Sequence, residues 1–170
     1  MTDIGAFVDG TYSRAYRTAC LIMGNPADAE EAVQEAFLRA WRFRAAVRES
    51  ESMDAWLYRV LVNTCYSKLR SVARVRAEVA LDDDHSTDAL DPAEAAAVDE
   101  LGVLVRDALA ALPESLRVPV VLRYFAGLSE KEIADAIRRR PGTVKSRLHE
   151  ARRRLAADAR LQALSEEAGT

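Results

Sequence analysis

The sequence predicts an all-α protein built from two small helical domains, and three observations support this. The 170 residues are 49% hydrophobic but only 6% aromatic, with 7 Gly and 5 Pro, which is too few turn formers for an all-β protein. Apolar residues recur at three- and four-residue spacing in both halves, as on the buried face of an amphipathic helix. Between the halves lies a stretch rich in Asp, Ser and Thr whose first part lacks that spacing, which predicts a linker.

Charge divides the chain into the same three parts. Residues 1–73 contain 9 basic and 9 acidic side chains, residues 74–100 contain 2 and 9, and residues 101–170 contain 13 and 9. The net charge of -3 therefore conceals an acidic middle and a basic end.

The stretch GNPADAEEAVQEAFLRAWRF has the start signals of a helix. Asn25 is a suitable N-cap, Pro26 suits the first helical position, and acidic residues follow where the helix dipole favours them. The predicted buried stripe consists of Ala29, Val33, Ala36, Phe37, Ala40 and Trp41, and the opposite face carries Glu31, Gln34, Glu35, Leu38 and Arg42.

A second helix is expected in DAWLYRVLVNTCYSKLRSVAR, after a polar break at residues 48–53, with Asp54 as its cap. Neither helix alone offsets the entropy of its ordering, so this half should be a small bundle. The predicted buried side is Trp56, Leu57, Val60, Leu61, Thr64 and Leu69, and the other side is Arg59, Asn63, Tyr66, Lys68 and Arg70.

The acidic middle, residues 74–100, is predicted to be a solvated linker. Its Asp82–His85 run could be read as metal ligands, but it lacks the glycine and closing glutamate of a calcium loop, so no metal is expected. Cys20 and Cys65 lie apart in apolar stretches and are expected to be packed thiols. The chain has no apolar run long enough to span a bilayer and no basic signal region, so a cytoplasmic protein without membrane insertion is expected.

The pattern resumes at Leu101 with LGVLVRDALAALP as one helix and LRVPVVLRYFAG as the next. Because of Pro119, the latter should begin near Leu116 or bend, and Gly127 should end it. Ser129 and Glu132 then form a capping box at the start of a further helix.

The segment PGTVKSRLHEARRRL combines an apolar stripe with many cations. Val144, Leu148, Ala151 and Leu155 predict one buried face, which leaves short polar groups at the centre of the outward face and cations at its margins. Such a face suits the DNA major groove, and the short turn RRR before it matches a helix-turn-helix. A charged surface helix and a membrane-lying helix are the alternatives, although the small apolar face is already needed for docking.

Four fragments in series, DAEEAVQEAFLRAW, DAWLYRVLVNTCYSKLR, LPESLRVPVVLRYFAGLSEKEIADAI and GTVKSRLHEARRRL, resemble the extracytoplasmic-function (ECF) class of bacterial sigma factors. The resemblance covers about residues 7–155. It implies sigma region 2 in residues 1–73, the linker in residues 74–100, sigma region 4 in residues 101–160 and a tail in residues 161–170.

The resemblance also implies three groups of functional residues. One binds the β′ clamp of RNA polymerase, whose core also includes the β subunit, and two bind promoter DNA at its -10 and -35 elements. The polymerase-binding group maps onto Glu31, Gln34, Glu35 and Leu38, the -10 group onto Arg59, Asn63, Tyr66 and Arg70, and the -35 group onto Lys145, Ser146, Arg147, His149 and Arg153.

This chain departs from the family pattern at three positions. Arg138 replaces a frequent glycine in the turn, which is costly if that site needs positive φ, and Arg140 replaces a capping serine. Glu150 stands where a basic residue is common, so it would either accept a hydrogen bond from cytosine or repel phosphate.

The resemblance predicts a sigma factor that directs core RNA polymerase to promoters and is controlled by an anti-sigma factor. The alternative is a dimeric helix-turn-helix regulator, which would leave the two helices of the first half without a role. An enzyme is not expected, because only His85 and His149 are available and no phosphate-binding loop, metal motif or nucleophile elbow is present; no cofactor is expected either.

Overall fold

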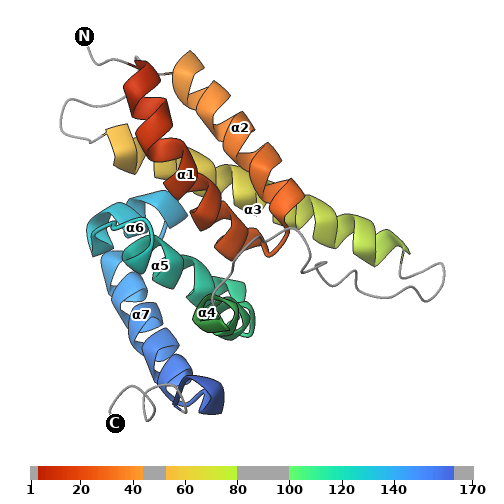
Figure 1. Ribbon diagram of the computed structural model, residues 1–170, viewed down its shortest axis with the longest axis vertical. Coiled ribbons are helices and arrows are strands. Elements are labelled where there is room, and N and C mark those ends of the chain that lie inside the picture. Colours follow the sequence, from red (N-terminus) through yellow and green to blue (C-terminus); the bar gives the residue numbers. More distant parts are fainter. Residues whose placement is uncertain (1–3, 44–52, 80–99, 163–170) are drawn as a thin grey trace. The chain divides into compact units, whose positions relative to one another are not determined.

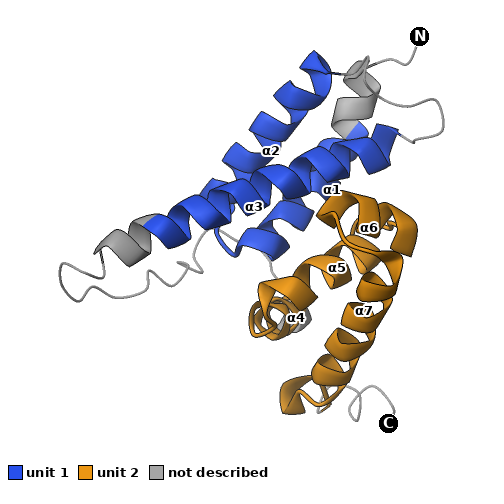
Figure 2. Ribbon diagram, turned by 180° about the vertical axis from the view of Figure 1, so that it is seen from behind, with its two compact units in different colours: residues 1–91 blue, residues 92–170 orange. Residues whose placement is uncertain are grey.

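The computed structural model describes residues 4–43, 53–79 and 100–162, and over these ranges the chain forms helices and no strands (Figure 1). The all-α prediction is confirmed. The chain divides into two compact units, residues 1–91 and residues 92–170 (Figure 2). Residues 80–99, which hold most of the predicted linker and its acidic run, lie outside the described residues.

The first unit contains α1 (Ile4–Met23), α2 (Pro26–Arg42) and α3 (Met53–Val79), and each of these helices packs against the other two. α1 buries Thr11, Ala15, Thr18 and Ile22, whose spacing places them on one face. It ends at Gly24, which adopts a φ of 74° and donates its N–H to the Cys20 carbonyl at 2.8 Å. Glycine suits this position because it takes a positive φ without a steric penalty.

α2 starts as the sequence predicts but buries a narrower stripe. The Asn25 side chain accepts a hydrogen bond from the Asp28 N–H at 3.1 Å, which caps the helix. The prediction that Trp41 is buried is wrong, because its side chain is 49% exposed. With 3.6 residues per turn, Trp41 lies about 130° around the helix from the centre of the buried stripe. That stripe consists of Ala29, Ala32, Val33 and Ala36.

α3 supplies more buried residues to the core of the first unit than α1 or α2, and its start differs from the prediction. The helix begins at Met53, so Asp54 lies in its first turn, where the carboxylate accepts a hydrogen bond from Arg14 of α1 at 2.8 Å. The Arg14 guanidinium also lies 5.8 Å from the centre of the fully buried Tyr58 ring. The helix continues past residue 73, the expected end of the first domain, to Val79. Its buried residues are Ala55, Trp56, Leu57, Tyr58, Leu61, Val62, Thr64 and Cys65.

Neither cysteine forms a disulfide within the described residues, and Cys20 is half-buried. Cys65 is buried, and desolvation raises the pKa of its thiol to about 12. Because thiolate is the reactive form, Cys65 behaves as a packed apolar side chain at neutral pH.

The second unit contains α4 (Glu100–Ala110), α5 (Glu114–Tyr124), α6 (Glu130–Ile137) and α7 (Pro141–Ala156). α5, α6 and α7 pack against one another, with α5 as the apolar centre. α5 begins at Glu114, before the predicted start at Leu116, and includes Pro119. The ring of Pro119 has no N–H, so the Ser115 carbonyl lacks its usual helical donor. α5 buries Leu116, Val118, Pro119, Val120, Val121 and Leu122.

The turn between α5 and α6 is held by hydrogen bonds that determine where α6 begins. Gly127 has a φ of 73°, and across the turn the Leu128 N–H donates to the Leu122 carbonyl at 3.0 Å. The predicted capping box is confirmed: Ser129 Oγ accepts from the Glu132 N–H at 3.2 Å, and the Glu132 carboxylate accepts from the Ser129 N–H at 2.8 Å. These bonds fix where α6 begins and hence where α7 follows.

Candidate nucleic-acid interface

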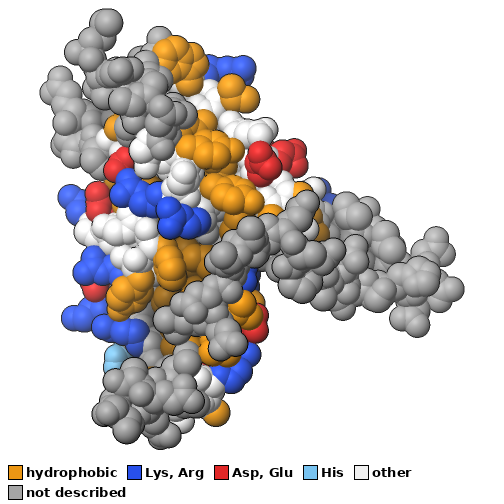
Figure 3. Space-filling view, viewed as in Figure 1, with side chains coloured by type: hydrophobic (Ala, Val, Ile, Leu, Met, Phe, Trp, Pro, Cys, Tyr) orange, Lys and Arg blue, Asp and Glu red, His pale blue; other side chains and the backbone are white. Residues whose placement is uncertain are grey.

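α7 has one buried face and one exposed polar face. Val144, Leu148 and Ala151 are buried against the rest of the second unit, as predicted, while Leu155 is only half-buried. Figure 1 shows α7 as the long blue helix packed on α5 and α6. In Figure 3, Lys and Arg side chains gather along the outer edge of the part that α6 and α7 form. The docking face is therefore apolar, and the face left to solvent is cationic.

The turn from α6 to α7 matches the predicted helix-turn-helix and carries both predicted irregularities. Arg138 adopts φ 53° and ψ 52°, which is the left-handed conformation that favours glycine. Arg140 occupies the N-cap position of α7 without a side-chain hydrogen bond to the helix. Pro141 stands at the first helical position, where its fixed φ is already helical.

Four of the five residues assigned to the -35 element are exposed on α7. Lys145, Ser146, His149 and Arg153 are exposed, whereas Arg147 is half-buried at the margin of the docking face. Ser146 Oγ donates to the Thr143 carbonyl at 3.0 Å, which leaves its lone pairs directed outward from the helix. This surface offers donors and acceptors at its centre and cations around them.

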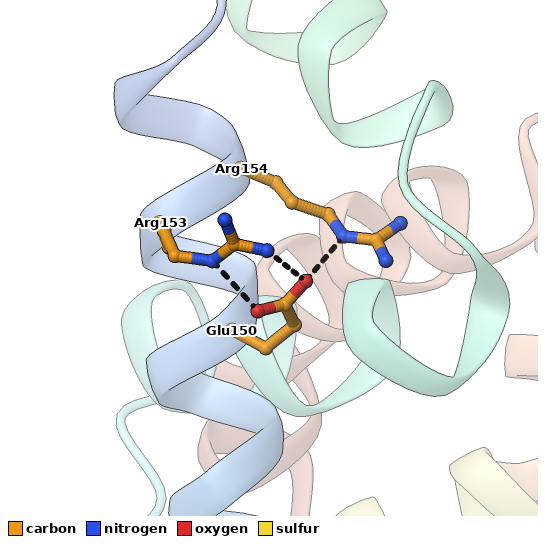
Figure 4. A network of polar contacts seen from close by, with 3 residues as sticks. All are labelled: Glu150, Arg153 and Arg154. Carbon is orange, nitrogen blue, oxygen red and sulfur yellow. Dashed lines mark hydrogen bonds and ion pairs between the residues drawn. The ribbon is translucent and has the colours of Figure 1, made fainter.

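Glu150 does not stand alone on this surface, because it pairs with two arginines of the following turn (Figure 4). Arg153 donates through Nε to one carboxylate oxygen and through Nη2 to the other, each at 2.9 Å. Arg154 donates through Nε at 2.8 Å. Hydrogen bonds from Arg153 and then Arg154 lower the pKa of Glu150 from 4.5 to about 2. Glu150 is thus ionised at neutral pH with both oxygens engaged, an arrangement that its i+3 and i+4 spacing from these arginines predicts.

The residues assigned to the -10 element form a stripe on α3. Arg59, Asn63, Tyr66 and Arg70 follow the helical repeat, so they lie on one face. The first three are half-buried and Arg70 is exposed. Arg70 Nε donates to the Tyr66 carbonyl at 3.2 Å, which holds the guanidinium close to the helix. An amide and an aromatic ring between two cations are groups that suit unstacked bases.

The residues assigned to polymerase binding lie on α2, away from its buried stripe. Leu38 is 68% exposed, which is unusual for a large apolar side chain. Glu31 forms an ion pair with Lys68 of α3 at 2.9 Å, Glu35 pairs with Arg39, and Gln34 donates to Glu30 at 3.4 Å. The face therefore combines acceptors with an exposed leucine.

The structure adds exposed aromatic residues that the sequence interpretation missed. Trp41 lies about 60° around α2 from Leu38, so it belongs to the same exposed face. Phe43 just beyond α2 is 56% exposed, and at the end of α5 Tyr124 is 58% exposed. A helical wheel centred on the alanines of α2 would have placed Trp41 correctly.

The described part of the chain shows neither a metal site nor a membrane-spanning helix. No group of three or more His, Cys, Asp or Glu side chains is arranged there to hold a metal ion. None of the described helices is both long enough and apolar enough to cross a membrane. The acidic run that includes His85 lies outside the described residues.

Two family models match the chain in order. Sigma-70 region 2 matches residues 7–75, and sigma-70 region 4 matches residues 102–155. The first match covers α2 and most of α1 and α3, and the second covers most of α4 to α7.

Several known proteins are similar to this chain over most of its length and of their own. The RNA polymerase sigma-H factor of Pseudomonas aeruginosa is 36% identical over 152 residues, 83% of this chain and 77% of that protein. The ECF RNA polymerase sigma factor SigL of Mycobacterium tuberculosis is 38% identical over 143 residues, 82% of this chain and 79% of that protein. A structure of the sigma factor RpoE in complex with the anti-sigma factor NepR from Bartonella quintana matches with a TM-score of 0.74 and 25% identity, covering 91% of this chain and 95% of that one.

Proposed function

The chain belongs to the ECF sigma factors of the sigma-70 family, and from this premise we propose that it directs core RNA polymerase to a specific set of promoters. One observation carries the proposal: regions 2 and 4 occur in order on separate helical units, and the second unit exposes a cationic helix-turn-helix face. A dimeric regulator would need the second unit alone and would leave the first without a role.

We assign core polymerase binding to the first unit, through Glu31, Gln34, Glu35 and Leu38 of α2. Leu38 supports this assignment most directly, because an exposed leucine among polar groups is a typical anchor of a protein interface. Trp41 extends the same surface with a second apolar side chain. The β′ clamp is the expected partner of this surface, and the β subunit is the further expected contact of the factor.

We assign -10 recognition to Arg59, Asn63, Tyr66 and Arg70 on α3. Cations can follow the backbone of a separated strand while the Tyr66 ring stacks on a base and the Asn63 amide donates and accepts hydrogen bonds. The residues share one helix face, so a single strand can contact several of them at once.

We assign -35 recognition to α7, with Lys145, Ser146, Arg147 and His149 in its first half and Arg153 in its second. The first half of a recognition helix reaches base edges, and later residues reach phosphates. The short polar side chains Ser146 and His149 therefore suit base contacts, and Arg153 suits the backbone.

In this proposal the polymerase supplies the phosphoryl chemistry, so the chain itself is not an enzyme. We propose that it acts in the cytoplasm, where promoter DNA and polymerase meet, and that the linker between regions 2 and 4 is the stretch between the end of α3 and the start of α4, residues 80–99. The complex of the similar RpoE with NepR supports the further proposal that an anti-sigma factor holds this chain inactive.

Run-off transcription tests the proposal. Core polymerase with this chain should initiate from a subset of a random promoter library that core alone does not use. Asn63→Ala should reduce initiation while leaving core binding intact, because Asn63 lies on the -10 stripe and not on α2. Failure to initiate from any library member, with the chain bound to core, would contradict the proposed function.

A further inference from the structure

The Glu150 cluster on α7 does not follow from the family resemblance. Glu150 is the only acidic residue of α7, all of which the structure describes. It binds Arg153 through both carboxylate oxygens and Arg154 through one. Elsewhere on the helix Lys145 and Arg147 form no ion pair within the described residues. The cations of the second half of α7 are therefore partly neutralised, and those of the first half are not.

The N–H groups that Arg153 donates to Glu150 are the same groups that it would donate to a DNA phosphate. A carboxylate and a phosphate both accept the parallel N–H pair of an arginine, here Nε and Nη2 of Arg153. The same edge of Arg153 cannot serve both acceptors at once. Arg153 is 69% exposed and Glu150 is 31% exposed, so a phosphate can reach the pair and compete for it.

We propose that Glu150 is an internal competitor of DNA phosphate, which lowers the non-specific affinity of α7 and so raises its promoter specificity. Non-specific binding comes almost wholly from phosphate contacts, whereas discrimination comes from base contacts. By pairing with Arg153 and Arg154, Glu150 weakens their contacts with phosphate and does not affect the first half of α7, which is proposed to read the bases. This inference rests on the proposed function of α7 and adds a specificity-determining residue to it.

The test is the binding of the full chain to a fluorescent mixed-sequence DNA duplex over a range of salt concentrations. Glu150→Gln keeps the shape of the side chain and removes its charge. We expect this variant to bind about fivefold more tightly at low salt, with a salt slope steeper by about 1 to 2, since each added phosphate contact contributes about 0.9. Equal affinity, or no measurable binding by either chain, contradicts the proposal. Weaker binding also contradicts it, because Glu150 would then orient Arg153 toward DNA.

Two controls separate competition from a change in overall charge. Glu114→Gln in the first turn of α5 changes the net charge equally without touching the cluster, and it should leave the slope unchanged. In a chain already carrying Arg153→Gln and Arg154→Gln, the further change Glu150→Gln should have no effect on the duplex affinity. If it strengthens binding as much as in the wild-type background, the competition model is wrong.

A third variant distinguishes this proposal from the proposed function. Lys145→Gln removes an unpaired cation from the first half of α7 and should weaken duplex binding if α7 contacts DNA at all. If Lys145→Gln has no effect, the assignment of α7 to DNA fails. If it weakens binding while Glu150→Gln does not strengthen it, only the role of Glu150 fails.

Discussion

At the scale of single residues, the turn before α7 and the Glu150 cluster within α7 depart most from the usual residue choices for a turn and for a basic helix. Arg138 adopts a left-handed backbone conformation and Arg140 leaves the helix start without a side-chain cap. Glu150 forms hydrogen bonds with both Arg153 and Arg154. These residues lie in or beside the proposed DNA-binding surface, where cations favour phosphate binding. At these positions the residue that is best for local helix stability differs from the residue that is best for binding DNA.

The Glu150 carboxyl should titrate far below an ordinary glutamate. Its native pKa is lowered from 4.5 to about 2, so the pairing stabilises the native state fully above pH 4.5 and is lost as the pH falls toward 2. A ¹³C NMR titration of the side-chain carboxyls should show one glutamate with a midpoint near 2. Arg153→Gln with Arg154→Gln should move that midpoint upward. A wild-type midpoint near 4.5 would be inconsistent with the cluster.

Arg138→Gly should stabilise the protein despite removing a side chain. A non-glycine residue in the left-handed region destabilises the folded state by roughly 1–2 kcal/mol. Glycine removes that strain, but it lowers the free energy of unfolding by roughly 0.5–1 kcal/mol because its unfolded chain is more flexible. The net gain in the free energy of unfolding should be about 0.5–1 kcal/mol, measured by chemical denaturation.

The matched control is Arg138→Ala, which also removes the guanidinium but keeps the Cβ and hence the strain. It should give no comparable gain. Equal stabilisation by both substitutions would show that charge repulsion among the arginines of the turn, rather than the backbone, is the cause.

At the scale of elements, the helix starts of the chain differ in how well they are capped. α2 has Asn25, and α6 has the reciprocal bonds of Ser129 and Glu132. α7 relies on Pro141 at its first position and on burial of its apolar stripe. The proposed recognition helix is therefore positioned by packing and by the turn that precedes it, because its own N-terminus lacks a side-chain acceptor.

Arg140→Ser should supply that missing acceptor. Arg140 already has the extended φ and ψ of an N-cap, so a serine hydroxyl can accept an N–H of the first turn of α7. We expect a gain of about 1 kcal/mol in the free energy of unfolding. Arg140→Ala lacks the acceptor and serves as the control. If alanine stabilises as much as serine, capping does not explain the effect.

At the scale of the whole molecule, the proposed polymerase and -35 surfaces lie on different compact units. α2 of the first unit carries Leu38, and α7 of the second unit carries the cationic face. A sigma factor must hold polymerase and promoter at once, so placing these contacts on separate units connected by a stretch of chain allows each to be made independently.

This division predicts that polymerase binding and duplex binding can be lost separately. Leu38→Ser should weaken the affinity for core polymerase about tenfold, or about 1.4 kcal/mol, by removing an apolar anchor. Its duplex affinity and thermal stability should stay unchanged, since Leu38 is 68% exposed. Fluorescence anisotropy with core and with duplex measures both affinities on one labelled protein.

Lys145→Gln is the reciprocal variant and should keep full affinity for core polymerase. If Leu38→Ser binds core as tightly as the wild type, the assignment of α2 to polymerase loses its support. Loss of both activities in either variant would mean that the two surfaces are not independent.

Much of the fold could be predicted because helix formation depends on near neighbours. The Asn25 cap, the Ser129–Glu132 box and the stripe of Val144, Leu148 and Ala151 are patterns within a few turns, and the structure confirms each. The predictions for Trp41 and Asp54 are wrong for different reasons. The predicted stripe of α2 is too wide, which a helical wheel centred on its alanines corrects. Asp54 pairs with Arg14 across the bundle, and that contact leaves no trace in the local sequence.

The sequence by itself determined the all-α class, the starts of α2 and α6, the buried stripe of α7 and the family to which the chain belongs. The tertiary structure decided which polar groups meet between helices, as in the pairing of Glu31 with Lys68 and of Arg14 with Asp54. It also showed that Arg138 takes a positive φ. Periodicity and caps are set by residues within a turn or two, whereas contacts between helices depend on how whole elements pack, and that packing is a property of the assembled core.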